Sequence, residues 1–184
     1  MPGRDAYQQP AAKFARGVYH ARNRRLAELV AAGGPRRIFE FAAGSYDLAR
    51  LILDRQPAIE TYRWSDFAPR CIAESRKILA GYPACTLEEL DIDADYAAVD
   101  WSAYDTVICV SLEHLARDRE ILEAIAPQTR VFLSLPRFGA PTHLRWFNGE
   151  LQIRRRYAEL IAIDRIEQIR GGGLRKFLVV AHRP

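Results

Sequence analysis

The sequence has little of what marks a membrane, secreted or zinc-binding protein. Its 184 residues include only three cysteines, Cys71, Cys85 and Cys109, and no CxxC spacing. This pattern argues against a disulfide framework and against a cysteine-based zinc site. No apolar run is long enough to cross a bilayer, and the first residues lack the apolar segment of a secretory signal. We therefore expect a cytoplasmic protein with no membrane partner.

Neither basic nor acidic residues dominate the sequence. The 27 basic and 23 acidic residues leave a net charge of +4, which permits an anionic partner without requiring one. The densest basic run is Arg154–Arg156, and we interpret it as a solvated helix face. A nucleic-acid-binding surface more often shows a wider basic stripe with interleaved aromatic residues, so nucleic acid is not an expected partner. The sequence gives no indication of the oligomeric state.

The hydrophobic share of 49% and the length suit one globular domain. We divide it into an N-terminal helical cap (1–34), a core (35–138) and a segment with a helix and a C-terminal hairpin (139–184). Within the core, strands alternate with helices, which predicts a largely parallel sheet covered on both faces. The expected strands are 37–42, 58–65, 84–90, 104–111, 130–135, 160–169 and 174–182, and the expected helices include 11–32, 46–55, 69–79 and 118–126.

The end of the chain departs from this alternation. Gly171-Gly172-Gly173 joins the last two strands, and so short a connection makes an antiparallel hairpin. We therefore predict an α/β fold with a seven-stranded Rossmann-like sheet, in which five parallel βα units precede a terminal antiparallel hairpin. We expect the last strand to be buried on both faces, with Leu174, Phe177, Val179 and Ala181 on one side and Leu178 and Val180 on the other.

Ligands of open α/β sheets bind at the carboxyl ends of the strands, so the residues after each strand are the candidates. The first such loop, EFAAGSYD (40–47), is a tight turn in which Gly44 lets the backbone approach a ligand. Asp66 follows Gly44 by about the interval at which an acidic residue meets a ribose hydroxyl in nucleotide-binding folds. The alternative is that Asp66 caps the helix that begins at Pro69.

Three features together resemble the class I S-adenosylmethionine-dependent methyltransferases. They are the acidic residue and glycine loop at 40–47, the segment DFAP (66–69), and the stretch YDTVICVSLEHLARDREIL (104–122), which resembles the family's fourth motif. The terminal hairpin also matches, because in that family the last strand inserts antiparallel beside the fifth. Ala42 and Tyr46 depart from the pattern, because the family usually has glycines at both positions. A large side chain at Tyr46 could crowd the methionine end of the cofactor.

The resemblance implies S-adenosylmethionine as the cofactor and places an aspartate against the adenine, here Asp91 with Ile92, or Asp93 in the alternative register. The implied cofactor-binding residues are Glu40, Ala42, Gly44, Tyr46, Asp66, Phe67, Asp91, Ile92 and Ser111. The implied reaction is methyl transfer to an oxygen or nitrogen atom of a small-molecule acceptor. Aromatic residues mixed with Arg and His would suit an acceptor that carries an anionic group. Candidate acceptor contacts are Tyr7, Tyr19, His20, Glu113, Arg137 and Trp146.

His114 and His143 are the candidate catalytic residues, because a histidine near neutral pKa can accept a proton from the acceptor. The alternative for His114 is that it fixes its loop through a backbone hydrogen bond. We expect no metal site. Glu113 and His114 are adjacent, so on a helix their side chains should diverge, and Val110 stands where RNA-methylating relatives of the family carry a further glutamate ligand.

Two other functions remain open, an RNA methyltransferase and a non-catalytic methyltransferase-like binding protein. A nicotinamide-binding domain is less consistent with the sequence, since it would show two or three glycines in the first loop and a sixth parallel strand.

Overall fold

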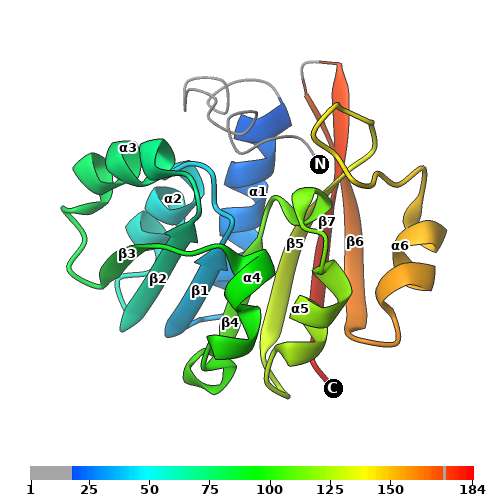
Figure 1. The fold of residues 1–184 in the computed structure, drawn as a ribbon. Helices are drawn as coiled ribbons and strands as arrows, with labels where there is room; N and C mark the ends of the chain where they lie inside the picture. The colour runs from blue at the N-terminus through cyan, green and yellow to red at the C-terminus, as the bar shows by residue number, and fades with distance from the viewer. Residues whose placement is uncertain (1–17, 172) are drawn as a thin grey trace.

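The computed structural model describes residues 18–171 and 173–184. These residues form a seven-stranded sheet with the strand order β3-β2-β1-β4-β5-β7-β6 (Figure 1). Strands β1 to β5 pair in parallel, whereas β7 pairs antiparallel with both β5 and β6. The predicted parallel sheet with a terminal antiparallel hairpin is therefore confirmed.

The elements follow the predicted order closely. The strands are β1 (Arg37–Phe41), β2 (Thr61–Asp66), β3 (Cys85–Glu89), β4 (Thr106–Cys109), β5 (Arg130–Pro136), β6 (Ala162–Gly171) and β7 (Leu174–His182). The helices are α1 (Val18–Ala32), α2 (Asp47–Arg55), α3 (Pro69–Leu79), α4 (Ile92–Asp95), α5 (Asp118–Ala124) and α6 (Glu150–Tyr157), with 3-10 turns η3 (Tyr96–Ala98), η4 (Trp101–Ala103) and η5 (Leu112–His114). The expected helix start at Ala11 and the candidate Tyr7 lie outside the described residues.

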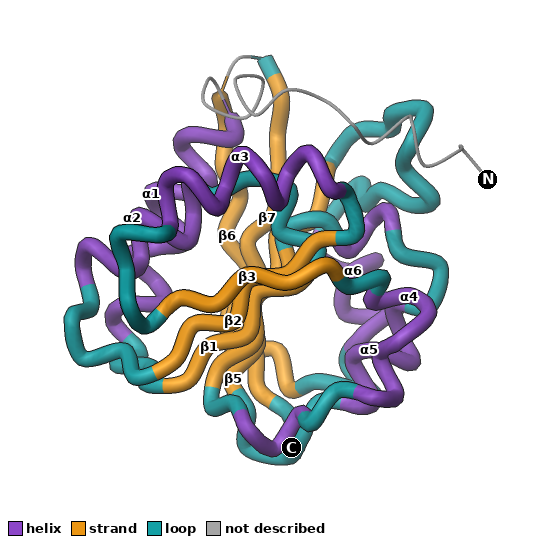
Figure 2. Tube along the Cα trace, turned by 60° about the vertical axis from the view of Figure 1, so that its left-hand side comes forward, coloured by secondary structure: helices purple, strands orange, loops and turns teal. Residues whose placement is uncertain are grey.

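Helices cover the sheet on both faces, as Figure 2 shows with the sheet seen nearly edge-on. One buried cluster lies under α1, α2 and α3 and includes Leu26, Leu48 and Ile72. The other lies under α4, α5 and α6 and includes Ile92, Ile121 and Ile153. No helix within residues 18–171 and 173–184 combines the length and the apolar character needed to cross a bilayer.

Strand β7 joins the two clusters because its side chains alternate between the two faces of the sheet. Phe177, Val179 and Ala181 belong to one cluster, and Leu178 and Val180 belong to the other. The prediction for Leu174 was wrong, since this side chain is 37% exposed. Leu174 pairs only with Gly171 of β6, at the end of the hairpin that extends beyond the last residue of β5.

The sheet brings the candidate loops to one edge. Because β1, β2 and β4 run parallel, the segments that follow Phe41, Asp66 and Cys109 leave the sheet at the same side. The strand order also reverses between β1 and β4, with the chain passing outward to β2 and β3 on one side and to β5 on the other. Such a reversal point is where open α/β sheets bind their ligands.

Candidate functional site

A pocket opens at this edge of the sheet. Its walls come from the loop after β1, the end of β2, the residues after β4, and one residue each of α1 and α3. The lining residues are Arg22, Ala42, Ala43, Gly44, Ser45, Asp66, Phe67, Cys71, Val110, Ser111, His114 and Leu115. The fold thus brings five of the nine predicted cofactor contacts to one cavity, namely Ala42, Gly44, Asp66, Phe67 and Ser111.

The loop after β1 has an unusual backbone. Gly44 has φ +70°, in the left-handed region that favours glycine, and a Cβ built on it would meet no atom within 4 Å. Ala42 also has a positive φ, of 48°, which a side chain makes unfavourable. The turn needs the left-handed conformation at position 42 even though glycine is absent there. Tyr46 is half-buried against the cluster under α1 and α2 and does not line the pocket.

Asp66 ties two segments of the pocket together. Its side chain accepts hydrogen bonds from the backbone N–H groups of Gly44 at 2.8 Å and Ala68 at 2.9 Å. Burial raises the pKa of Asp66, and these backbone bonds partly oppose that rise. The backbone of Phe67 also interacts with this carboxylate, and three such bonds still leave a lone pair that can accept from a hydroxyl group. Ala68 is the N-cap residue of α3, so its contact with Asp66 also fixes the segment that leads into the helix.

Glu40 lies beneath the pocket and does not line it. Its carboxyl group is fully buried and accepts a hydrogen bond from the Tyr62 hydroxyl at 2.6 Å. The other oxygen, Oε1, has no hydrogen-bond partner among the described residues. Burial raises the pKa of Glu40 to about 8, against the weaker lowering effects of Tyr62 and Arg22. Glu40 is therefore a buried support of the loop in which burial favours the protonated form.

The two aspartates after β3 have different surroundings. Asp93 accepts hydrogen bonds from the backbone N–H groups of Ala116 at 2.8 Å and Arg117 at 2.9 Å, and so fixes the segment after η5. Asp91 is half-buried at the start of α4, and Ile92 is buried in the apolar cluster behind it. Neither Asp91 nor Ile92 lines the pocket described above.

Sequence reasoning missed Arg22, which lines the pocket from α1. The side chain is only 4% exposed, and its Nε donates to Asn23 at 2.8 Å. Burial lowers the pKa of Arg22, and the charges of Glu113 and Glu40 oppose that effect. A signal was present, because Arg22 lies four and eight residues before the buried Leu26 and Val30, and thus on the core-facing side of the helix.

The turn η5 is held by the segment that follows β5. Leu144 N–H donates to the carbonyl of Glu113 at 2.9 Å, and Arg145 donates to the carbonyls of Leu112 at 2.9 Å and Leu115 at 2.6 Å. Arg145 also contacts the buried Asp118 at 3.3 Å. Asp118 also accepts hydrogen bonds from Nε and Nη2 of Arg156. This arginine of the basic run at 154–156 therefore ties α6 to α5 and does not face only solvent.

These contacts assemble a cluster that we call the 113–176 cluster, which comprises Glu113, His114, His143 and Lys176. Ligand atoms of Glu113, His114 and His143 all lie within 4.8 Å of one another. The expectation that Glu113 and His114 diverge too far to share an ion is therefore wrong, because their long side chains bring the donor atoms together from adjacent positions of η5. The structure also brings His143 to them from a segment 28 residues away, whose Thr142 carbonyl contacts His114.

Hydrogen bonds orient both imidazole rings. Nδ1 of His114 lies 2.8 Å from the Thr142 carbonyl, and Nδ1 of His143 lies 3.0 Å from the Phe138 carbonyl. A carbonyl only accepts, so each neutral ring donates from Nδ1–H and carries its lone pair on Nε2. Burial lowers the pKa of His143, partly opposed by Glu113, which favours the neutral ring. His114 lines the pocket, and the ring of His143 lies behind it at 5.0 Å between centroids.

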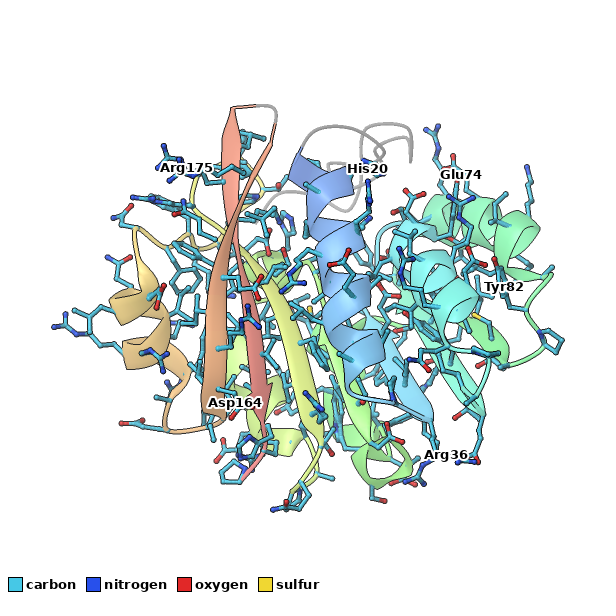
Figure 3. All side chains as sticks on the ribbon, turned by 180° about the vertical axis from the view of Figure 1, so that it is seen from behind. His20, Arg36, Glu74, Tyr82, Asp164 and Arg175 are labelled. Atoms are coloured by element: carbon cyan, nitrogen blue, oxygen red, sulfur yellow. The ribbon has the colours of Figure 1, made fainter. Side chains whose placement is uncertain are left out.

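The remaining acceptor candidates lie apart from one another. Tyr19 is half-buried on α1, with its ring 5.4 Å from the Lys176 ammonium, while His20 on the next position is exposed (Figure 3). Arg137 is exposed. Trp146 is 52% exposed and lines a separate open basin with Arg119, Arg155 and Gln152.

Comparison with known proteins agrees with the fold. No model of a protein family matches the chain, and no curated protein matches it in sequence. Solved structures do match. The N-methyltransferase NodS from Bradyrhizobium japonicum, in complex with S-adenosylhomocysteine, is 16% identical with a TM-score of 0.70, over 96% of this chain and 93% of that one.

Two further matches are the CurJ carbon methyltransferase and a putative methyltransferase in complex with the Trm112 activator of Haloferax volcanii. The first is 14% identical with a TM-score of 0.74, over 97% of this chain and 57% of that one. The second is 13% identical with a TM-score of 0.69, over 89% of this chain and 91% of that one. At these identities the matches establish the Rossmann-like fold of class I methyltransferases.

Proposed function

We propose that this protein is an S-adenosylmethionine-dependent methyltransferase that acts on an oxygen or nitrogen atom of a small-molecule acceptor. The observation that carries the proposal is the pocket at the reversal point of the sheet, lined by Gly44, Asp66 and Ser111 from three different strand ends. Its neighbours in fold include an N-methyltransferase with S-adenosylhomocysteine bound. The neighbours also include a carbon methyltransferase, so the fold alone does not select the acceptor atom.

The residues of the pocket fit this cofactor. The open space at Gly44 leaves room for close approach to the backbone, and Asp66 retains lone pairs for the ribose hydroxyls. Arg22 presents a buried guanidinium that suits the methionine carboxylate, because a charge-assisted bond is strong in a desolvated site. Asp91 is the candidate for the adenine, as the first acidic residue after β3, with Asp93 as the alternative register.

When bound, the cofactor would supply an electrophilic methyl group on a sulfonium. The chain then has to align the acceptor, exclude water and remove a proton when the acceptor is a hydroxyl or an ammonium. We assign the last task to His114, and its position in the pocket wall and the contact of its Nδ1 with the Thr142 carbonyl support this role. Proton acceptance would then fall to Nε2. His143 contacts the ring of His114 and would support it.

The acceptor side of the pocket would be formed by the segment after β5, which Arg145 fixes to η5. Tyr19, Arg137 and Trp146 remain candidates for contacts to an acceptor that is partly apolar and carries an anionic group. Glu113 is buried beside Lys176 and would act on the acceptor only through its neighbours.

An RNA methyltransferase is the alternative that the sequence left open. The pattern of basic residues does not favour it. Arg156 pairs with Asp118 and Arg25 pairs with Glu167, so these charges are already compensated.

The test is transfer of a labelled methyl group. Purified protein is incubated with methyl-labelled S-adenosylmethionine and, separately, with a panel of phenols, phenolic acids and primary amines, and with total RNA. The proposal predicts label in a small-molecule product and a His114→Ala variant with much lower turnover but unchanged affinity for S-adenosylhomocysteine. Label in RNA alone would support the RNA methyltransferase instead. Tight cofactor binding with no transfer to either class would indicate a non-catalytic binding protein.

A further inference from the structure

Three of the four members of the 113–176 cluster are residue types that bind transition metals. The donor atoms of Glu113, His114 and His143 lie within 4.8 Å of one another. Donors around a zinc-like ion lie about 3–4 Å apart, because each bond is about 2 Å long. The backbone carbonyls of Thr142 and Phe138 orient the two rings in the way that carbonyls orient metal-bound histidines. A small inward shift would therefore complete a three-residue metal site.

The fourth member, Lys176, places a positive charge at this point. Its ammonium lies 3.0 Å from Oε1 of Glu113, the oxygen that is 3.9 Å from Nε2 of His143. Lys176 and Glu113 are 2% and 1% exposed, so neither charge is compensated by solvent. The ammonium also faces the ring of Tyr19, at 5.4 Å from its centroid, which favours a cation there.

The charges within the cluster balance without a metal. Glu113 Oε1 accepts a hydrogen bond from the buried Lys176 ammonium at 3.0 Å, so the chain itself supplies a cation beside this buried acid. Glu113 Oε2 accepts no hydrogen bond within the described part of the chain, so Lys176 is the main compensation for this buried anion.

We infer that Lys176 is a built-in cation that occupies the place of a divalent metal in the 113–176 cluster and makes the cluster independent of metal. Lys176 comes from β7, in register with Pro136 of β5, so the sheet itself fixes the ammonium against η5. The inference concerns which cation the cluster holds. It does not depend on methyl transfer, and its test uses metal binding instead of activity.

The test compares the wild-type protein with Lys176→Met. Removal of the ammonium leaves Glu113 buried with two imidazoles and no cation, which is the composition of an open metal site. Co²⁺ is the probe, because its visible absorption reports coordination, and calorimetry gives the stoichiometry. We expect Lys176→Met to bind one Co²⁺ per chain. The wild-type cluster should show no binding at Co²⁺ concentrations up to about 100 times those that saturate the variant.

Two matched variants localise the signal. The double variant Lys176→Met/His143→Ala should lose the Co²⁺ bound by the single variant. The matched double variant Lys176→Met/His20→Ala should keep it, since His20 is exposed on α1. If Lys176→Met unfolds in buffer, Co²⁺ should restore its thermal transition, because the inference makes ammonium and metal interchangeable. Wild-type binding that is lost on His143→Ala would overturn the inference. A folded Lys176→Met that ignores Co²⁺, or an unfolded one that Co²⁺ does not rescue, would overturn it as well.

Discussion

Replacement of Glu40 by glutamine tests how strongly burial controls this part of the site. The variant keeps the shape of the side chain and an oxygen that can accept from the Tyr62 hydroxyl, which now lies 2.6 Å from the carboxyl group. It removes only the ability to ionise. Glu40 is fully buried, so the substitution reports on the protein interior and not on a surface charge.

The magnitude follows from the two pKa values. Burial raises the pKa of Glu40 to about 8 in the folded protein, whereas the ordinary value is 4.5. A group whose pKa is raised on folding contributes its full stability below the unfolded value and loses it as the pH rises toward the folded value. Each pH unit in this window costs about 1.4 kcal/mol, so the wild type should lose up to roughly 4 kcal/mol relative to Glu40→Gln by about pH 7.5.

The assay is urea unfolding of both proteins at several pH values from 4.5 to 8. The difference in the free energy of unfolding isolates Glu40, because every other group titrates equally in the two chains. We expect Glu40→Gln and wild type to be close at pH 4.5 and the variant to be increasingly more stable up to pH 8. The exposed Glu120→Gln serves as the matched control and should show a flat difference. A flat or reversed difference for Glu40→Gln would refute the reasoning and mean that Glu40 is ionised in the folded protein.

Three further predictions concern Ala42, Asp66 and the C-terminal hairpin. Ala42→Gly should raise the free energy of unfolding by about 0.5–1 kcal/mol in chemical denaturation, because glycine relieves the positive φ of 48°; a loss of stability would contradict the strain. Asp66→Ala should weaken S-adenosylhomocysteine binding by about 1–3 kcal/mol in calorimetry and also lower the melting temperature, since Gly44 N–H loses its acceptor; unchanged affinity would remove Asp66 from the site. Deletion of the chain after Gly171 should prevent folding, because β7 lies inside the sheet between β5 and β6; a truncated protein that unfolds cooperatively would argue against that.

The fold was largely predictable because its signals are local. Apolar segments of strand length alternate with amphipathic segments of helix length. Helix α3 begins at Pro69 and ends at Leu79, as the sequence indicated. The hairpin followed from three consecutive glycines between two strand-like runs. The limits of the second strand were less accurate, since β2 begins at Thr61 instead of Ala58. A turn in which Ile59 N–H donates to the Gln56 carbonyl precedes it.

The site was predictable only where it depends on the strand ends. Gly44, Asp66 and Ser111 reach the pocket because parallel strands end at one edge. The 113–176 cluster was not predictable, since it needs a histidine from the segment after β5 and a lysine from the last strand. Lys176 follows the exposed Arg175 near the start of β7 and precedes the apolar run 177–181, so the sequence did not distinguish it from a solvated strand end.

The binding of S-adenosylhomocysteine to the purified chain tests the central claim most directly. Calorimetry of the wild-type protein should show one site per chain with a micromolar dissociation constant, competed by S-adenosylmethionine and unaffected by NAD. Arg22→Met, which removes the buried guanidinium from the pocket wall, should weaken that binding at least tenfold. No heat of binding at millimolar S-adenosylhomocysteine in a folded wild-type protein, or equal competition by NAD, would contradict the account.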